Sequence, residues 1–107
     1  MMDMSTGETR VMEIVSFRLN DGVDVEEFRK AAEAIDTLLQ GRGTASARTL
    51  VMDDDGLWTD IIEWSTMEDA KSAAEELVKD PVFAPLGAMI DGASVQMRHA
   101  PVQHQMR

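Results

Sequence analysis

The sequence contains no cysteine. Without thiol groups the chain can form no disulfide bond, no cysteine-based zinc site and no thiolate nucleophile, so these three classes of chemistry are excluded. A reducing compartment is compatible with this absence.

Basic residues are also scarce. Ten Lys and Arg stand against 20 Asp and Glu, which gives a formal net charge of −10. A chain of this charge repels phosphate backbones and anionic lipid headgroups, so we expect neither nucleic acid nor membrane as a partner. The sequence has no run of 18 apolar residues and no apolar run of signal-peptide length near its start. We therefore expect a cytoplasmic protein.

The length of 107 residues is that of one domain with one hydrophobic core. We expect residues 1–10 to form a flexible N-terminal arm, because they are polar and lack periodicity. Residues 11–100 should form the folded domain, and residues 101–107 a polar C-terminal tail.

The segment 57–64 is expected to be a central strand, because it carries large apolar groups on both faces. Side chains alternate along a strand, so Leu57 and Ile61 share one face with Glu63. The other face carries Trp58, Asp60, Ile62 and Trp64. A strand of this kind must be covered twice, once by helices of its own chain and once by a second copy.

Periodicity and cap signals predict the remaining elements. Further strands are expected at 11–19, 45–52 and 94–99, a helix from about residue 25 to the glycines at 41–43, and a second helix at 67–78. Asp24 and Ser65 are the expected N-caps, each with a glutamate three residues later. A short helical piece should start at Asp80 and be interrupted by Pro85.

This order predicts an α+β fold of the ferredoxin-like βαββαβ type. Right-handed connections place both helices on one face of a four-stranded antiparallel sheet, with strands 11–19 and 57–64 in the middle.

The stretch 60–64, followed by Ser65-x-x-Glu68-Asp69-Ala70 and by Asp80-Pro81-Val82-Phe83, resembles the antibiotic biosynthesis monooxygenase (ABM) family of dimeric α+β barrels. The similarity covers nearly all of residues 11–100. It implies a homodimer whose two sheets pack face to face, with a ligand pocket in each subunit between sheet and helices. Relatives include cofactor-free oxygenases of polycyclic phenols, haem-degrading enzymes and members without established activity.

The resemblance implies that this chain does not degrade haem. The tryptophan used by the haem-degrading branch matches Trp64, but its asparagine falls at about Val15 and its ligating histidine around Gly87. Oxygenases of the family often use tyrosine, and this chain has none. We expect no cofactor.

We also expect no metal. If Gly56 is placed at the sixth position of an EF-hand loop, the first and twelfth positions, which must supply ligands, fall on the apolar residues Val51 and Ile62.

Asp60 is the first candidate for catalysis. It shares a strand face with Trp58 and Trp64, and a partly desolvated carboxylate between indoles could have a raised pKa suited to proton abstraction. The alternative is structural: Trp58 is half-exposed, Trp64 is core, and Asp60 pairs with an arginine. The available arginines are Arg18, Arg48 and Arg98.

His99 is the second candidate. It follows Val95 and Met97 on an apolar strand face, where it could act as a base at the mouth of a pocket. A histidine at a strand end can equally be a hydrogen-bonded structural residue.

Together these patterns predict a dimeric barrel that binds a small apolar or aromatic molecule and acts as a cofactor-independent monooxygenase or isomerase. The expected catalytic residues are Asp60, His99 and Trp64, and the expected ligand-binding residues are Phe17, Trp58, Ile62 and Trp64. A non-catalytic dimeric module, structural or ligand-binding, is the alternative. In an enzyme the space between sheet and helices should be a pocket with convergent polar groups, whereas in a module side chains should fill it.

The dimer should bury the sheet face that carries Met12, Ile14, Leu57 and Ile61, with Glu63 pointing into the interface.

Overall fold

The two strands predicted to be central are the middle strands of the sheet. The computed structural model describes residues 9–106. In it β1 (Val11–Leu19) and β3 (Trp58–Trp64) lie side by side, with β2 (Ala45–Met52) beside β3 and β4 (Ile90–Pro101) beside β1. All pairings are antiparallel, so the predicted four-stranded ferredoxin-like sheet is confirmed. Most of the arm predicted at residues 1–10 lies outside the described residues.

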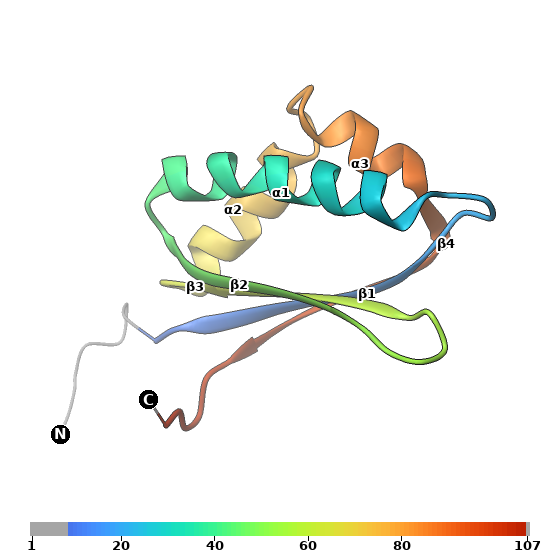
Figure 1. Cartoon of the computed structure of the whole chain (residues 1–107). Coiled ribbons are helices and arrows are strands. Elements are labelled where there is room, and N and C mark those ends of the chain that lie inside the picture. Colours follow the sequence, from blue (N-terminus) through green and yellow to red (C-terminus); the bar gives the residue numbers. More distant parts are fainter. Residues whose placement is uncertain (1–8, 107) are drawn as a thin grey trace, which may run out of the picture.

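The helices cover one face of this open sheet (Figure 1). They are α1 (Val25–Arg42), α2 (Met67–Leu77) and α3 (Phe83–Met89). Side-chain alternation places Glu13, Val15 and Phe17 of β1 on the helix-covered face, while Ile14 pairs with Ile61 on the other, helix-free face. The sheet therefore divides the molecule into a core side and an open side.

The first helix begins and ends as predicted. The Asp24 side chain accepts a hydrogen bond from the Glu26 N–H at 2.9 Å, which satisfies one unpaired donor of the first turn. Gly43 ends the helix with a φ of 74°, a conformation that glycine adopts without steric cost. The buried stripe of α1 consists of Phe28, Ala32, Ile35 and Leu39.

Two predictions near the second and third helices are wrong. The N-cap of α2 is Thr66 and not Ser65: Thr66 Oγ1 accepts the Asp69 N–H at 3.1 Å, whereas the Ser65 hydroxyl bonds to the Thr44 carbonyl. Pro85 does not interrupt α3. It is the third residue of the helix, where a backbone N–H would have no partner in the helix in any case.

The last strand is longer than the predicted 94–99. It begins at Ile90, which pairs with Leu19, and continues to Pro101, which pairs with Val11, so β4 pairs with β1 at both ends of that strand. Between these ends the register shifts from the pair Ser16–Gln96 to the pair Arg18–Asp91, so one residue of β1 corresponds to the four residues 92–95 of β4, which accounts for the difference in strand length.

An aromatic cluster closes one end of the core. Phe17 and Trp58 stack with ring centroids 6.5 Å apart, and Phe28 meets the Trp58 ring edge-on at 4.8 Å. Trp58 is 5% exposed, so the alternative interpretation of a half-exposed Trp58 is wrong. This cluster belongs to the core that α1 forms with the sheet.

The helix-free face carries both apolar and charged groups. Glu63 lies there as its alternation predicts, but it is buried within its own chain, with the Arg10 guanidinium 3.2 Å from its carboxylate. Gln105 of the C-terminal segment donates a hydrogen bond to the same carboxylate at 3.3 Å. In the described part of the chain, no helix is long and apolar enough to cross a membrane.

Candidate functional site

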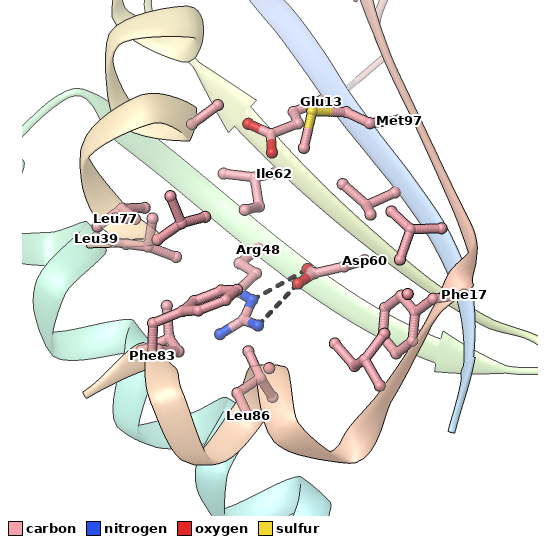
Figure 2. A pocket seen from close by; sticks show the side chains of 18 of the residues that line it. Glu13, Phe17, Leu39, Arg48, Asp60, Ile62, Leu77, Phe83, Leu86 and Met97 are labelled. Atoms are coloured by element: carbon pink, nitrogen blue, oxygen red, sulfur yellow. Dashed lines mark hydrogen bonds and ion pairs between the residues drawn. The ribbon is translucent and has the colours of Figure 1, made fainter. Parts of the chain in front are cut away.

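A cavity of about 330 Å³ lies between the sheet and the helices (Figure 2). Its volume falls at the lower end of the range found for small-molecule sites. Every strand and every helix contributes to its wall, which is mostly apolar and consists of Glu13, Val15, Phe17, Phe28, Ile35, Leu39, Arg48, Asp60, Ile62, Ala74, Leu77, Val78, Phe83, Leu86, Gly87, Ile90, Gly92, Val95 and Met97.

The cavity reaches solvent beside β4. Among its lining residues, Val95 and Met97 on β4 are 40% and 49% exposed, and Val78 after α2 is 56% exposed. Large apolar side chains in such exposed positions form a rim that an apolar molecule can cross without meeting charge. The deeper wall includes Phe17 and Leu86, which are buried.

Arg48 and Asp60 form a bidentate ion pair in the cavity wall. Arg48 Nε and Nη2 donate to the two Asp60 carboxylate oxygens at 3.0 and 2.8 Å, and both side chains are largely buried. Arg48 Nη1 also donates to the Ala32 carbonyl and to Asp36. Burial by itself would lower the pKa of Arg48, but the hydrogen bonds and charges of Asp60 and Asp36 outweigh it and raise that pKa, so the guanidinium stays charged.

Glu13 is the second acidic group in the wall. It is 6% exposed, and its Oε1 accepts a hydrogen bond from Trp64 Nε1 at 2.9 Å. His99 Nε2 lies 3.6 Å from the same oxygen, too far for a hydrogen bond but close enough for an ion pair when the imidazole is protonated. Burial raises the pKa of the Glu13 carboxyl, and this effect exceeds the opposing contributions of Trp64 and His99.

The strand register explains how these three residues meet. Glu13 lies opposite His99 across the β1–β4 pair, and Val11 lies opposite Trp64 across the β1–β3 pair. Trp64 is therefore a diagonal neighbour of Glu13 on the helix-covered face, within reach of a long side chain. The indole is fully buried, so the hydrogen bond to Glu13 is shielded from water.

The structure brings only some of the predicted site residues to the cavity. Phe17, Asp60 and Ile62 line it. Trp64 and His99 stand behind Glu13 and are not in the wall, and Trp58 borders a separate surface depression with Arg48. The ion pair with Arg48 agrees with the structural alternative for Asp60. The predicted catalytic roles of Asp60, His99 and Trp64, and the predicted binding roles of Phe17, Trp58, Ile62 and Trp64, stay predictions.

Glu13 lines the cavity but is not among the site residues predicted from the sequence. Its signal was present: Glu13 is a single charge between Val11 and Val15 on a strand face that is otherwise apolar. A carboxylate in such a position must be buried with partners or serve a ligand. Within residues 9–106, no group of three or more His, Asp or Glu side chains is placed to hold a metal ion.

Comparison by sequence finds no matching family model and no matching curated protein. Comparison by structure finds SnoaB, a cofactor-independent oxygenase from Streptomyces nogalater, in a mutant form with a TM-score of 0.75 and 13% identity, covering 92% of this chain and 97% of SnoaB. A protein from Caulobacter crescentus described as a candidate antibiotic biosynthesis monooxygenase has a TM-score of 0.72 and 10% identity, covering 92% and 93%.

A third neighbour is a dimeric ferredoxin-like protein of unknown function from Thermobifida fusca, with a TM-score of 0.69 and 11% identity, covering 94% of this chain and 97% of that one. The resemblance to the ABM family is thus confirmed at the level of the fold. This chain has the ferredoxin-like fold that is shared by SnoaB and by proteins described as dimeric.

Proposed function

We propose that this protein is a homodimer that binds a small, flat, largely apolar organic molecule in the cavity between the sheet and the helices. The observation that carries the proposal is the cavity itself: about 330 Å³ with a mostly apolar wall and three charged groups, Glu13, Arg48 and Asp60. In a purely structural module, side chains would fill the space between sheet and helices, whereas here a cavity lies there.

The wall suits a ring system that carries one or two oxygen atoms. Aromatic and aliphatic side chains such as Phe17, Phe83 and Leu86 can cover the faces of a flat ring. Arg48 uses four N–H groups in the hydrogen bonds described above, and a guanidinium has five. The remaining N–H can donate to a carbonyl or phenol oxygen of the ligand.

The activity we propose is cofactor-independent, either oxygenation or isomerisation of that ligand. Its support is the fold shared with SnoaB, a cofactor-independent oxygenase, together with a buried acid in the cavity wall. The alternative, a ligand-binding module without catalysis, differs in one measurable respect. It would bind the same compounds and leave them unchanged.

Binding can be tested with a cavity-filling pair of variants. Ala74 lies in the cavity wall on α2, and Ala74→Leu should occupy ligand space. Ala34→Leu makes the same change on the exposed side of α1 and is the matched control. Titration with 2-naphthol, measured by isothermal titration calorimetry, should saturate for the wild type and Ala34→Leu, and the affinity should weaken at least about tenfold for Ala74→Leu, a loss of about 1.4 kcal/mol.

Equal affinity of the two variants would place the ligand elsewhere. If neither 2-naphthol nor a wider panel of phenols, quinones and fused-ring ketones binds to the wild type, the proposed function is wrong.

A further inference from the structure

Glu13 is placed differently from the other acid in the cavity wall. Both carboxylate oxygens of Asp60 accept hydrogen bonds from Arg48. Glu13 has no cationic partner at hydrogen-bond distance among the described residues, and only its Oε1 is engaged, by Trp64. Its Oε2 accepts no hydrogen bond within residues 9–106, although the residue lines the cavity. One carboxylate oxygen of Glu13 is thus held by Trp64, and no described residue donates a hydrogen bond to the other.

The neighbours of Glu13 hold the carboxylate without neutralising it. Trp64 Nε1 is a neutral donor, so it orients the carboxylate and leaves its charge in place. His99 Nε2 is buried and has no hydrogen-bond partner in the described chain, and it faces the oxygen that Trp64 holds. A buried polar atom without a partner is rare in folded proteins and calls for an explanation. The contact found for His99 Nε2 in the described structure is the one with Glu13 Oε1, at 3.6 Å.

We propose that Glu13 is the base of this cavity, and that it takes a proton from a weakly acidic C–H group next to a carbonyl of the bound ligand, because the wall places this carboxylate together with the cationic Arg48. This inference rests on the proposed function, because it needs a ligand in the cavity. In it Glu13 is a catalytic residue, while Trp64 and His99 are positioning residues that act through Glu13.

The proton transfer balances without any oxidant or reductant. The C–H bond of the substrate breaks, its proton bonds to Glu13 Oε2, and the electron pair stays on the substrate as an enolate. One negative charge moves from the carboxylate to the enolate oxygen, for which Arg48 is the cationic group in the wall. Return of the proton to another carbon gives an isomer, and exchange with water replaces the hydrogen.

The electrostatic surroundings of Glu13 favour transfer of the proton from the substrate to its carboxylate. Burial raises the pKa of Glu13, and the nearby charge of Asp60 on β3 raises it further, while Trp64 on β3 and His99 on β4 lower it. A carboxylate with a raised pKa is a stronger base than an exposed one. Arg48 on β2, the remaining charged group in the wall, is already paired with Asp60 and with Asp36 on α1.

Hydrogen exchange of 2-tetralone tests the inference. This two-ring ketone has an acidic CH₂ group between its carbonyl and its aromatic ring, and in D₂O the loss of that CH₂ signal is followed by proton NMR. The wild type should accelerate exchange over buffer, and Glu13→Gln should lose at least about 100-fold of that acceleration, as expected for removal of a general base. Saturation-transfer NMR on the same samples reports binding.

Glu63→Gln is the matched control. Glu63 is also a buried glutamate in the sheet, but it lies on the helix-free face and outside the cavity wall, so this variant should exchange 2-tetralone at the wild-type rate. Trp64→Phe removes the neutral donor and should move the midpoint of the pH–rate profile upward, because the Trp64 hydrogen bond lowers the pKa of Glu13. Loss of packing alone would lower the rate without moving the midpoint.

The outcomes separate this inference from the proposed function. If 2-tetralone binds to the wild type without accelerated exchange, or if Glu13→Gln exchanges as fast as the wild type, Glu13 is not the base and the binding proposal stands. If 2-tetralone fails to bind while other fused-ring compounds bind, the inferred substrate class is wrong. If nothing in the panel binds, both proposals fail.

Discussion

Trp64 donates its indole N–H to the Glu13 carboxylate at 2.9 Å, joining two residues that are 51 positions apart in the chain. Both are buried, at 0% and 6% exposure, so water does not replace this hydrogen bond when it is removed. The bond ties the end of β3 to the start of β1 directly behind the cavity.

Trp64→Phe should therefore destabilise the fold beyond the loss of ring volume. A hydrogen bond to a charged group contributes about 1.5–3 kcal/mol, and its removal leaves the Glu13 carboxylate without its donor. Trp58→Phe is the control, because it makes the same ring change at a buried indole for which no side-chain hydrogen bond is found in the described structure. Urea unfolding followed by circular dichroism measures both. Equal losses for the two variants would show that the hydrogen bond adds little.

Glu13→Gln should change how stability depends on pH. Burial raises the pKa of Glu13 in the folded state, so folding is favoured while the carboxyl is protonated, and this contribution is lost as the pH rises through the folded-state pKa. Glutamine can still accept the Trp64 hydrogen bond and carries no charge. The melting temperature of Glu13→Gln minus that of the wild type should increase as the pH rises above 4.5, the ordinary pKa of a glutamate. A difference that is constant or falls with pH would contradict the raised pKa.

Arg48→Met should be among the most destabilising single changes in the sheet. It leaves the Asp60 carboxylate buried without its cationic partner. Removal of one partner of a buried ion pair lowers the free energy of unfolding by about 3–5 kcal/mol. The double variant Arg48→Met/Asp60→Leu should recover much of this loss, because it removes the unpaired charge as well. The comparison is Arg29→Ala, whose ion pair with Glu26 is exposed and should contribute at most about 1 kcal/mol.

Denaturant unfolding of the wild type, of the single variants Arg48→Met and Asp60→Leu and of the double variant gives the double-mutant cycle. If Arg48→Met costs no more than Arg29→Ala, the pair in the cavity wall is not energetically important.

Ile61→Arg should prevent dimer formation. Ile61 pairs with Ile14 at the centre of the helix-free face, and an interface there would bury on the order of 2,000 Å² or more, typical of permanent dimers. Light scattering should give twice the chain mass of 11.8 kDa for the wild type and monomer or aggregate for Ile61→Arg. Ala34→Arg, on the exposed side of α1, should leave the dimer intact. A monomeric wild type at micromolar concentration would rule out this interface.

Haem should not bind specifically. The positions at which the haem-degrading relatives would supply a hydrogen bond and an axial ligand are Val15 and the region of Gly87, and both of these residues lie in the cavity wall. The valine side chain cannot ligate iron, and glycine has no side chain. Absorbance titration should show a weak change that does not saturate. A sharp Soret band at one haem per chain would instead identify another ligand, and His99→Ala would be the first variant to examine.

The sequence alone predicted the architecture, because local patterns specify it. Apolar groups on both faces of 11–19 and 57–64 place these strands in the centre, and Asp24 and the glycine at 43 mark the ends of the first helix. The misplaced cap at Ser65 and the expected break at Pro85 are errors of one turn or less. They arise because neighbouring residues compete for the same cap and because proline is tolerated in a first helical turn.

Only the tertiary structure decided which acid faces the cavity with an unpaired oxygen. The sequence shows that Asp60 shares a face with two tryptophans, and also that three arginines are available, but not that Arg48 lies close enough to hold both of its carboxylate oxygens. The importance of Glu13 depends on Trp64 and His99, which are brought to it by strand register across 51 and 86 positions. Alternation along one strand determines the face on which a residue lies, but pairing between strands determines which residues it meets there.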